Sequence, residues 1–147
     1  VVYAVVMATK TTPLQYLSQV PLFSSCSTRD LGKIAKAADR ITLSAGTTMI
    51  TQGTAGKQAY VIIDGTATVK RNGKKIATIQ SGAMVGELSL LDRGSRTATV
   101  VCDTDCDVLV IDARHLFAVI DEVPAMAHKL LSALATRIRD LDRAHYG

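Results

Sequence analysis

A chain of 147 residues is long enough for one domain built around a single hydrophobic core. Hydrophobic residues make up 48% of the chain and charged residues 20%, which argues against intrinsic disorder. No apolar run approaches the roughly 18 residues that a membrane-spanning helix needs. A formal charge of +4 is too small by itself to indicate nucleic-acid binding.

The cysteines indicate a reducing compartment. Cys26, Cys102 and Cys106 are odd in number and form no Cys-x-x-Cys pair, so we expect no disulfide framework and a cytoplasmic location. Residues 1–6 are apolar but lack the basic region of a signal peptide, and we expect them to be a cloning remnant or an upstream extension. We therefore predict an N-terminal tail over residues 1–12 and one domain over residues 13–147.

In chain order, the first predicted elements are helices. Thr12 and Pro13 supply the cap and first-turn proline of a short helix over residues 14–19. Ser27 or Thr28 can cap a second helix. The apolar residues of that helix recur at helical spacing, at Leu31, Ile34, Ala35 and Ala38.

Glycines then divide the chain into short segments typical of β structure. Eight of the ten glycines fall between residues 46 and 94. The runs rich in β-branched residues are 47–51, 58–64, 66–70, 74–80, 96–101 and 107–112. Short strands separated by turn residues predict an antiparallel sandwich or barrel. Asn72-Gly73 is a strong type I′ hairpin signal and Asp64-Gly65 a weaker one.

The C-terminal part returns to helical patterns. We predict a short helix over residues 113–120 and a long helix from Pro124 to about residue 144. The apolar residues of the long helix recur at intervals of four and three, at Ala127, Leu131, Leu134, Ile138 and Leu141. This coiled-coil spacing fits either a homodimer through the helix or packing on the chain's own sheet. The predicted fold is mainly β with flanking helices: a jelly-roll-like antiparallel β-roll of about eight strands, with N-terminal helices and two C-terminal helices.

Residues 85–100 hold the groups that can carry chemistry. Gly86 provides a turn before one short helical turn, whose unpaired backbone N–H groups suit a phosphate. Arg96 can add a planar set of donors to the same anion, and the ionised Glu87 can accept a hydrogen bond from a sugar hydroxyl. The spacing alone is equally compatible with an ordinary Glu87–Arg96 ion pair at a sheet edge.

The same segment resembles a known motif. The run Gly86-Glu87-Leu88-Ser89-Leu90 followed by Arg96-Thr97-Ala98, with Glu and Arg nine positions apart, is similar to the phosphate-binding cassette of the cyclic nucleotide-binding domain. That family includes the catabolite activator protein, regulatory subunits of cAMP-dependent kinase and cyclic-nucleotide-gated channels. The resemblance covers about residues 13–145. It implies a non-catalytic sensor whose C-terminal helices move on ligand binding.

The resemblance also implies a role for individual residues. Glu87 would accept a hydrogen bond from the ribose 2′-hydroxyl and Arg96 would pair with the cyclic phosphate, close to Gly86. Backbone N–H groups of Ser89 and Thr97 would complete the phosphate site. The full implied set is Val85, Gly86, Glu87, Leu88, Ser89, Arg96, Thr97 and Ala98. Ile62 and Val69 would help Val85 to cover the purine, under a lid from the last helix that offers Arg137, Ile138, Leu141 and Tyr146.

The implied ligand is cAMP, with cGMP as the alternative, because a hydroxyl in the position of Thr97 occurs in binders of both. Two other outputs remain open: the effector half of a DNA-binding transcription regulator, whose helix-turn-helix would lie beyond Gly147, or a regulatory domain of a larger enzyme or transporter. We expect no nucleic-acid binding by this chain, no membrane insertion and no cofactor.

Three further patterns are not interpreted as functional sites. The aspartates from Asp103 to Asp107 lack the glycine and glutamate of a calcium loop, so we expect no metal and an exposed strand face or hairpin. Three histidines in the C-terminal part do not suit a cupin-type metal enzyme. The basic residues of the predicted hairpin tip should simply be solvated: Lys70, Arg71, Lys74 and Lys75.

Overall fold

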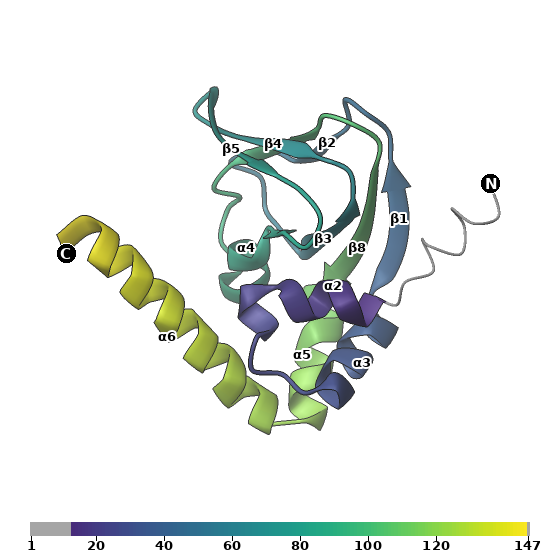
Figure 1. Ribbon diagram of the computed structural model, residues 1–147, viewed down its shortest axis with the longest axis vertical. Coiled ribbons are helices and arrows are strands. Elements are labelled where there is room, and N and C mark those ends of the chain that lie inside the picture. Colours follow the sequence, from purple (N-terminus) through teal and green to yellow (C-terminus); the bar gives the residue numbers. More distant parts are fainter. Residues whose placement is uncertain (1–12, 147) are drawn as a thin grey trace.

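The computed structural model describes residues 13–146, which form two antiparallel four-stranded sheets flanked by helices (Figure 1). One sheet has the strand order β1-β8-β3-β6 and the other the order β2-β7-β4-β5. The strands are β1 (Asp39–Leu43), β2 (Thr48–Ile50), β3 (Gln58–Asp64), β4 (Ala67–Arg71), β5 (Lys74–Ile79), β6 (Met84–Val85), β7 (Thr99–Cys102) and β8 (Cys106–Asp112). The predicted eight-stranded β-roll is confirmed.

Helices precede and follow the strands in the sequence, and one short helix, α4, lies between β6 and β7. They are α2 (Pro13–Gln19), the 3-10 turn η1 (Pro21–Phe23), α3 (Thr28–Ala37), α4 (Glu87–Asp92), α5 (Ala113–Glu122) and α6 (Ala125–Tyr146). Ser27 caps α3 by accepting from the Asp30 N–H, while the Asp30 carboxylate accepts from the Ser27 N–H. This capping box satisfies two backbone donors that a helix end otherwise leaves unpaired.

The two predicted hairpins have different outcomes. Asn72 and Gly73 have φ of 52° and 78°, and they join the paired strands β4 and β5 as expected of a type I′ turn. The prediction at Asp64-Gly65 is wrong, because β3 pairs with β6 and β8 whereas β4 belongs to the other sheet. This turn carries the chain from one sheet to the other.

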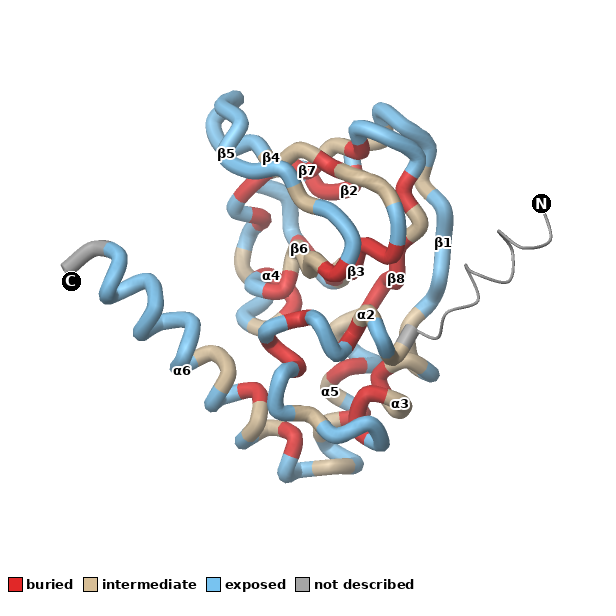
Figure 2. Tube along the Cα trace, in the orientation of Figure 1, coloured by how far each residue is buried: buried red, intermediate tan, exposed pale blue. Residues whose placement is uncertain are grey.

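The core has two parts, and the buried strands β3 and β8 contribute alternate residues to both (Figure 2). One part lies between the two sheets and includes Ile62, Val100 and Val108. The other lies between the first sheet and the helices, and it includes Phe23, Leu109 and Met126. The helices therefore bury the face of the first sheet that the second sheet does not cover.

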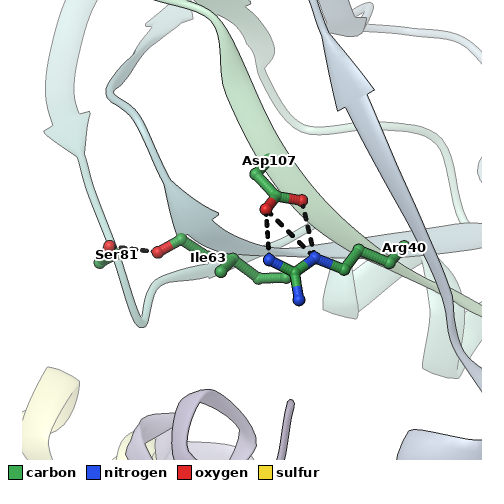
Figure 3. Close-up of polar contacts among 4 residues, drawn as sticks. All are labelled: Arg40, Ile63, Ser81 and Asp107. Carbon is green, nitrogen blue, oxygen red and sulfur yellow. Dashed lines mark hydrogen bonds and ion pairs between the residues drawn. The ribbon is translucent and has the colours of Figure 1, made fainter. Parts of the chain in front are cut away.

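Polar contacts tie the edges of the first sheet together (Figure 3). Arg40 on β1 donates to the Asp107 carboxylate on β8 from two nitrogens, Nε at 3.1 Å and Nη2 at 2.6 Å. The Ser81 hydroxyl donates to the Ile63 carbonyl at 2.5 Å. The second contact fixes the turn that leads into β6, and so positions the residues that follow it.

Helix α6 has two faces with different surroundings. Met126 and Leu130 are buried against the body of the domain, and Lys129 Nζ lies 2.6 Å from the Asp30 carboxylate. Leu131, Ile138 and Leu141 of the predicted stripe are 63%, 65% and 57% exposed, whereas Leu134 packs against the core of the domain. The stripe is therefore divided between the chain's own core and solvent, and three of its five residues are left uncovered. Among the described helices, none combines the length and the apolar character needed to cross a bilayer.

The cysteines behave as the sequence indicates. Cys26, Cys102 and Cys106 are free thiols, and the last two are buried where β7 meets β8. Burial raises the pKa of Cys102 to about 11, with a further contribution from Cys106. A thiol with such a pKa is protonated at neutral pH and is a poor nucleophile.

Candidate functional site

The site is built on the turn that joins β6 to α4. Gly86 has a φ of 83°, a left-handed conformation that favours glycine, and it stands immediately before the first residue of the helix. Glu87 and Ser89 are buried at 7% and 3% exposure, whereas Leu88 is 44% exposed. The short helix thus directs a carboxylate into the protein and a leucine toward its surface.

Arg96 is a buried cation. Its residue exposure is 8%, and its Nη1 donates to the Gly86 carbonyl at 3.2 Å. Burial lowers the pKa of the guanidinium, although Tyr60 acts in the opposite direction. In the described part of the chain no carboxylate lies within ion-pair distance of it. A buried guanidinium with unpaired N–H donors suits an anionic ligand, because burying an unpaired charge costs free energy that an anion would offset.

Neighbouring loops hold the backbone of Arg96. Its N–H donates to the Thr54 carbonyl at 2.8 Å, and its carbonyl accepts from the Gly53 N–H at 2.9 Å. Ala55 and Ser95 form an isolated β-bridge beside these bonds. The loop between β2 and β3 therefore positions the guanidinium, which the sequence pattern did not indicate.

Two glycines make room for the Arg96 side chain. A Cβ at position 56 would lie 2.5 Å from Arg96 Cζ and 2.7 Å from Ser89 Cβ. A Cβ at Gly86 would lie 2.5 Å from Arg96 Nη1. Gly86 was expected near the sugar. The structure shows a second reason for glycine at this position, because a side chain there would collide with Arg96. The role of Gly56 was not predicted, because its contact with Arg96, forty positions away, leaves no pattern in the local sequence.

Glu87 pairs with a different arginine from the one considered in the sequence. Its Oε1 accepts from Arg137 Nη1 of α6 at 2.7 Å. The Glu87 side chain is 10% exposed and that of Arg137 is 52% exposed. The alternative of a Glu87–Arg96 ion pair is therefore wrong: each of the two cassette charges faces the same space without neutralising the other.

That space is a cavity of about 200 Å³. It brings together the eight residues of the implied binding set: Val85, Gly86, Glu87, Leu88, Ser89, Arg96, Thr97 and Ala98. The rest of its lining is Ile50, Val69, Arg71, Met84, Val100 and Arg137. It combines apolar walls with three guanidinium groups and one carboxylate, an excess of positive charge that suits an anion with an apolar, hydroxyl-bearing body.

Some of the expected purine contacts and lid residues lie elsewhere. Ile62 is fully buried between the sheets and does not line the cavity. Ile138 and Leu141 are exposed at 65% and 57%. The side chain of Tyr146 lies outside the described residues. Of the three lid residues whose side chains the structure describes, only Arg137 lines the cavity.

A larger cavity of about 560 Å³ adjoins the first one. It lies between α6, the η1 region and the turn before β6, and it also includes Glu87 and Arg137. The Glu87–Arg137 ion pair thus stands at the boundary between the two cavities. Movement of α6 would change both.

Comparison with protein families gives a direct match. The model of the family described as "Cyclic nucleotide-binding domain" matches residues 40–123, which is more than half of the chain and includes the whole cassette. The chain belongs to the cyclic nucleotide-binding domain family.

Individual relatives agree with this assignment. A cAMP-dependent protein kinase regulatory subunit of Aspergillus niger is 38% identical over 95 residues, covering 63% of this chain and 23% of the relative. The chain therefore spans about a quarter of that regulatory subunit.

Solved structures show the same fold. The N-terminal domain of a transcriptional regulator from Streptomyces coelicolor A3(2) is 29% identical, with a TM-score of 0.79 over 88% of this chain and 96% of that one. The regulatory domain of Toxoplasma gondii PKA, solved as a co-crystal with cAMP, is 26% identical, with a TM-score of 0.70 over 76% of this chain and 44% of that one.

Proposed function

We propose that the chain is a non-catalytic sensor of a cyclic purine nucleotide, with cAMP as its first candidate ligand. The observation that carries this proposal is the buried Arg96, without a carboxylate partner in the described residues, in one cavity with Glu87. Arg96 would bind the cyclic phosphate and Glu87 the ribose 2′-hydroxyl, while Val69 and Val85 would lie against the base. The Aspergillus relative and the Toxoplasma co-crystal support cAMP as the ligand.

The signal would be transmitted by α6. Only its N-terminal half is buried in the domain, and its further half is tied to the cassette by the Arg137–Glu87 ion pair. A ribose hydroxyl on Glu87 would compete for the carboxylate that holds Arg137. The ligand can shift the position of α6 by no more than its affinity difference between the two positions, typically 1–3 kcal/mol.

A homodimer through α6 is part of the proposal. The exposed side of the helix carries Leu131, Ile138 and Leu141 at coiled-coil spacing. On the same heptad, Arg137 and Asp142 occupy the flanking positions that meet across a parallel dimer, and their charges are opposite. These features favour a second copy of the chain as the partner of this face.

A cytoplasmic location is also proposed, because free thiols such as Cys26 persist in reducing compartments.

Isothermal titration calorimetry tests the binding function. The wild-type protein should bind cAMP more tightly than 5′-AMP, because we propose that the cassette binds a cyclic phosphate. Arg96→Ala should lower the binding free energy by about 2–5 kcal/mol, since it removes one partner of a buried charge pair. Arg114→Ala is the control. Arg114 is exposed on α5 and does not line the cavity, so this variant removes the same charge and should leave binding unchanged. Undiminished binding by Arg96→Ala would refute the role of Arg96, and a wild-type protein that binds no cyclic nucleotide would refute the function.

A second function is favoured by one observation. The Streptomyces structure is the N-terminal domain of a transcriptional regulator, and this chain covers 96% of it. The same sensor would then be the effector-binding part of a DNA-binding protein. Sequencing the complete gene distinguishes the two, because the regulator requires a helix-turn-helix coding region after α6.

A further inference from the structure

Arg71 lines the candidate nucleotide cavity although it belongs to the hairpin tip that was expected to be merely solvated. Side chains alternate along a strand, so Ala67, Val69 and Arg71 of β4 share one face. Ala67 is fully buried and Val69 packs in the core between the sheets. Arg71 lies on the same face at the open end of the strand, where it is exposed to solvent and contributes to the cavity wall.

The neighbouring residues on the same hairpin have different surroundings. Thr68 points the other way and donates to the Asp103 carboxylate. Lys70 and Arg71 are both exposed, but Lys70 does not line the cavity. The tip itself is held in place, because Gln52 Nε2 donates to Asn72 Oδ1 at 2.8 Å and Asn72 N–H donates to Gln52 Oε1 at 2.9 Å. Arg71 is thus carried by a hairpin end that is fixed to the loop after β2.

One end of the Arg71 guanidinium is bonded to the cassette and the other is not. Its Nε donates to the Thr97 carbonyl at 3.1 Å, which sets the guanidinium beside the residue that follows Arg96. Its two terminal nitrogens have no partner among the described residues. The one carboxylate of the cavity, Glu87, is engaged by Arg137. Arg71 therefore offers a pair of parallel donors that the protein does not use.

The ligand's base is the group placed to meet these donors. If Glu87 binds the ribose and Arg96 the phosphate, the base occupies the remaining wall, which Val69, Val85 and Arg71 line. An arginine donates two parallel hydrogen bonds to N7 and O6 of guanine, which are both acceptors. On the same edge adenine presents N7 as an acceptor but an amino donor in place of O6, so it offers only one bond.

We propose that Arg71 is a specificity-determining residue that reads the N7/O6 edge of a guanine base and brings the affinity for cGMP closer to that for cAMP. This inference rests on the proposed cyclic nucleotide function and adds a cation that contacts the base to the one that binds the phosphate. It also gives the basic hairpin tip a role beyond solubility.

The test is calorimetric titration of the whole chain with cAMP, cGMP and cyclic IMP, which shares N7 and O6 with cGMP but lacks its 2-amino group. Arg71→Ala should weaken binding of cGMP and cyclic IMP about tenfold and that of cAMP by less than about threefold, as expected for loss of one bidentate base contact. Arg71→Lys keeps the charge without the planar fork, and it should show the same selective loss. Lys70→Ala, which removes a neighbouring charge from the outer face, should alter none of the three affinities.

Several outcomes would overturn the inference. An equal loss for all three nucleotides from Arg71→Ala would mean that Arg71 binds the phosphate. A loss for cGMP without a loss for cyclic IMP would place the contact at the 2-amino group, and no loss at all would remove Arg71 from the site. If Arg71→Ala does not fold, Arg71→Lys gives the same comparison. A wild-type protein that binds none of the three nucleotides would instead refute the proposed function itself.

Discussion

At the scale of single residues, the cassette was predictable because its members are close together in the sequence. Glu87 and Arg96 lie nine positions apart, and the pattern Gly86-Glu87 with Arg96-Thr97 identified both charges. What the pattern did not contain are residues that reach the site from other segments. Gly56 comes from the loop before β3 and Arg71 from the end of β4, and only the folded chain brings them to Arg96 and Thr97.

Gly56→Ala tests how closely Arg96 is packed. The new Cβ would lie 2.5 Å from Arg96 Cζ, so the guanidinium must move away from its position beside Gly86. We expect cyclic nucleotide affinity to fall by at least about tenfold, because charged hydrogen bonds depend strongly on geometry. Calorimetric titration measures this loss.

Gly32→Ala provides the control. Gly32 lies within α3 and has open space around the position of a Cβ. Alanine there should leave binding unchanged and stabilise the fold by up to about 1 kcal/mol, since glycine weakens a helix interior. Equal affinities for the two glycine variants would show that Arg96 is not confined by residue 56.

At the scale of elements, α6 consists of an attached half and a projecting half. Figure 1 shows the helix leaving the body of the domain along its length, and Figure 2 shows exposure increasing toward its C-terminal end. Met126, Leu130 and Lys129 hold the first half. Over the second half, Arg137 makes the ion pair with Glu87.

Arg137→Ala should loosen the second half of α6 without unfolding the domain. The side chain is 52% exposed, so solvent screening keeps the loss in unfolding free energy below about 1 kcal/mol. Hydrogen–deuterium exchange should become faster over residues 134–144 and stay the same over α5. Arg139→Ala is the matched control, because no ion pair of Arg139 occurs in the described residues. The same exchange rates in both variants would contradict the role of the Glu87 contact.

The attachment of α6 to α3 should depend on pH. The hydrogen bond from Lys129 and the one from the Ser27 backbone hold the pKa of Asp30 below its usual value. An acid with a lowered folded-state pKa contributes stability that is present above its unfolded pKa, about 3.9, and is lost as the pH falls through the folded value.

Asp30→Asn should therefore destabilise the protein by about 1 kcal/mol at pH 7, and the difference should shrink as the pH falls through the lowered folded-state pKa of Asp30. Urea denaturation at a series of pH values measures it. Asp121→Asn serves as the control, because Asp121 is exposed on α5 and has no ion pair in the described part of the chain. A difference that persisted unchanged at low pH would mean that the charge of Asp30 is not what stabilises this contact.

At the scale of the whole molecule, the sequence predicts the architecture well but misses the edge strands of the first sheet, β1 and β6. The two-sheet roll, the capped α3 and the long α6 follow from glycine spacing, Ser27 and helical periodicity. Strand β1 was not among the predicted runs although Arg40 to Leu43 alternate polar and apolar residues, and β6 has only two residues. The turn at Asp64-Gly65 was misassigned because a local turn signal does not reveal which sheet the next strand joins.

The exposed stripe of α6 leads to a prediction about assembly. Ile138→Glu should abolish the proposed homodimer, because it places a charge in the apolar seam, whereas Arg143→Glu on the outward side should not. Sedimentation velocity over a range of protein concentrations, with and without cAMP, measures this. A wild-type protein that stays monomeric throughout would contradict the dimer while leaving the nucleotide site unaffected.

The most direct test of the account is the crystal structure of the protein with cAMP or cGMP. The predicted result places the ribose 2′-oxygen within hydrogen-bond distance of the Glu87 carboxylate and the cyclic phosphate on the Arg96 guanidinium. A nucleotide found in the larger cavity beside α6, or a cassette cavity filled by protein side chains at saturating nucleotide, would contradict it.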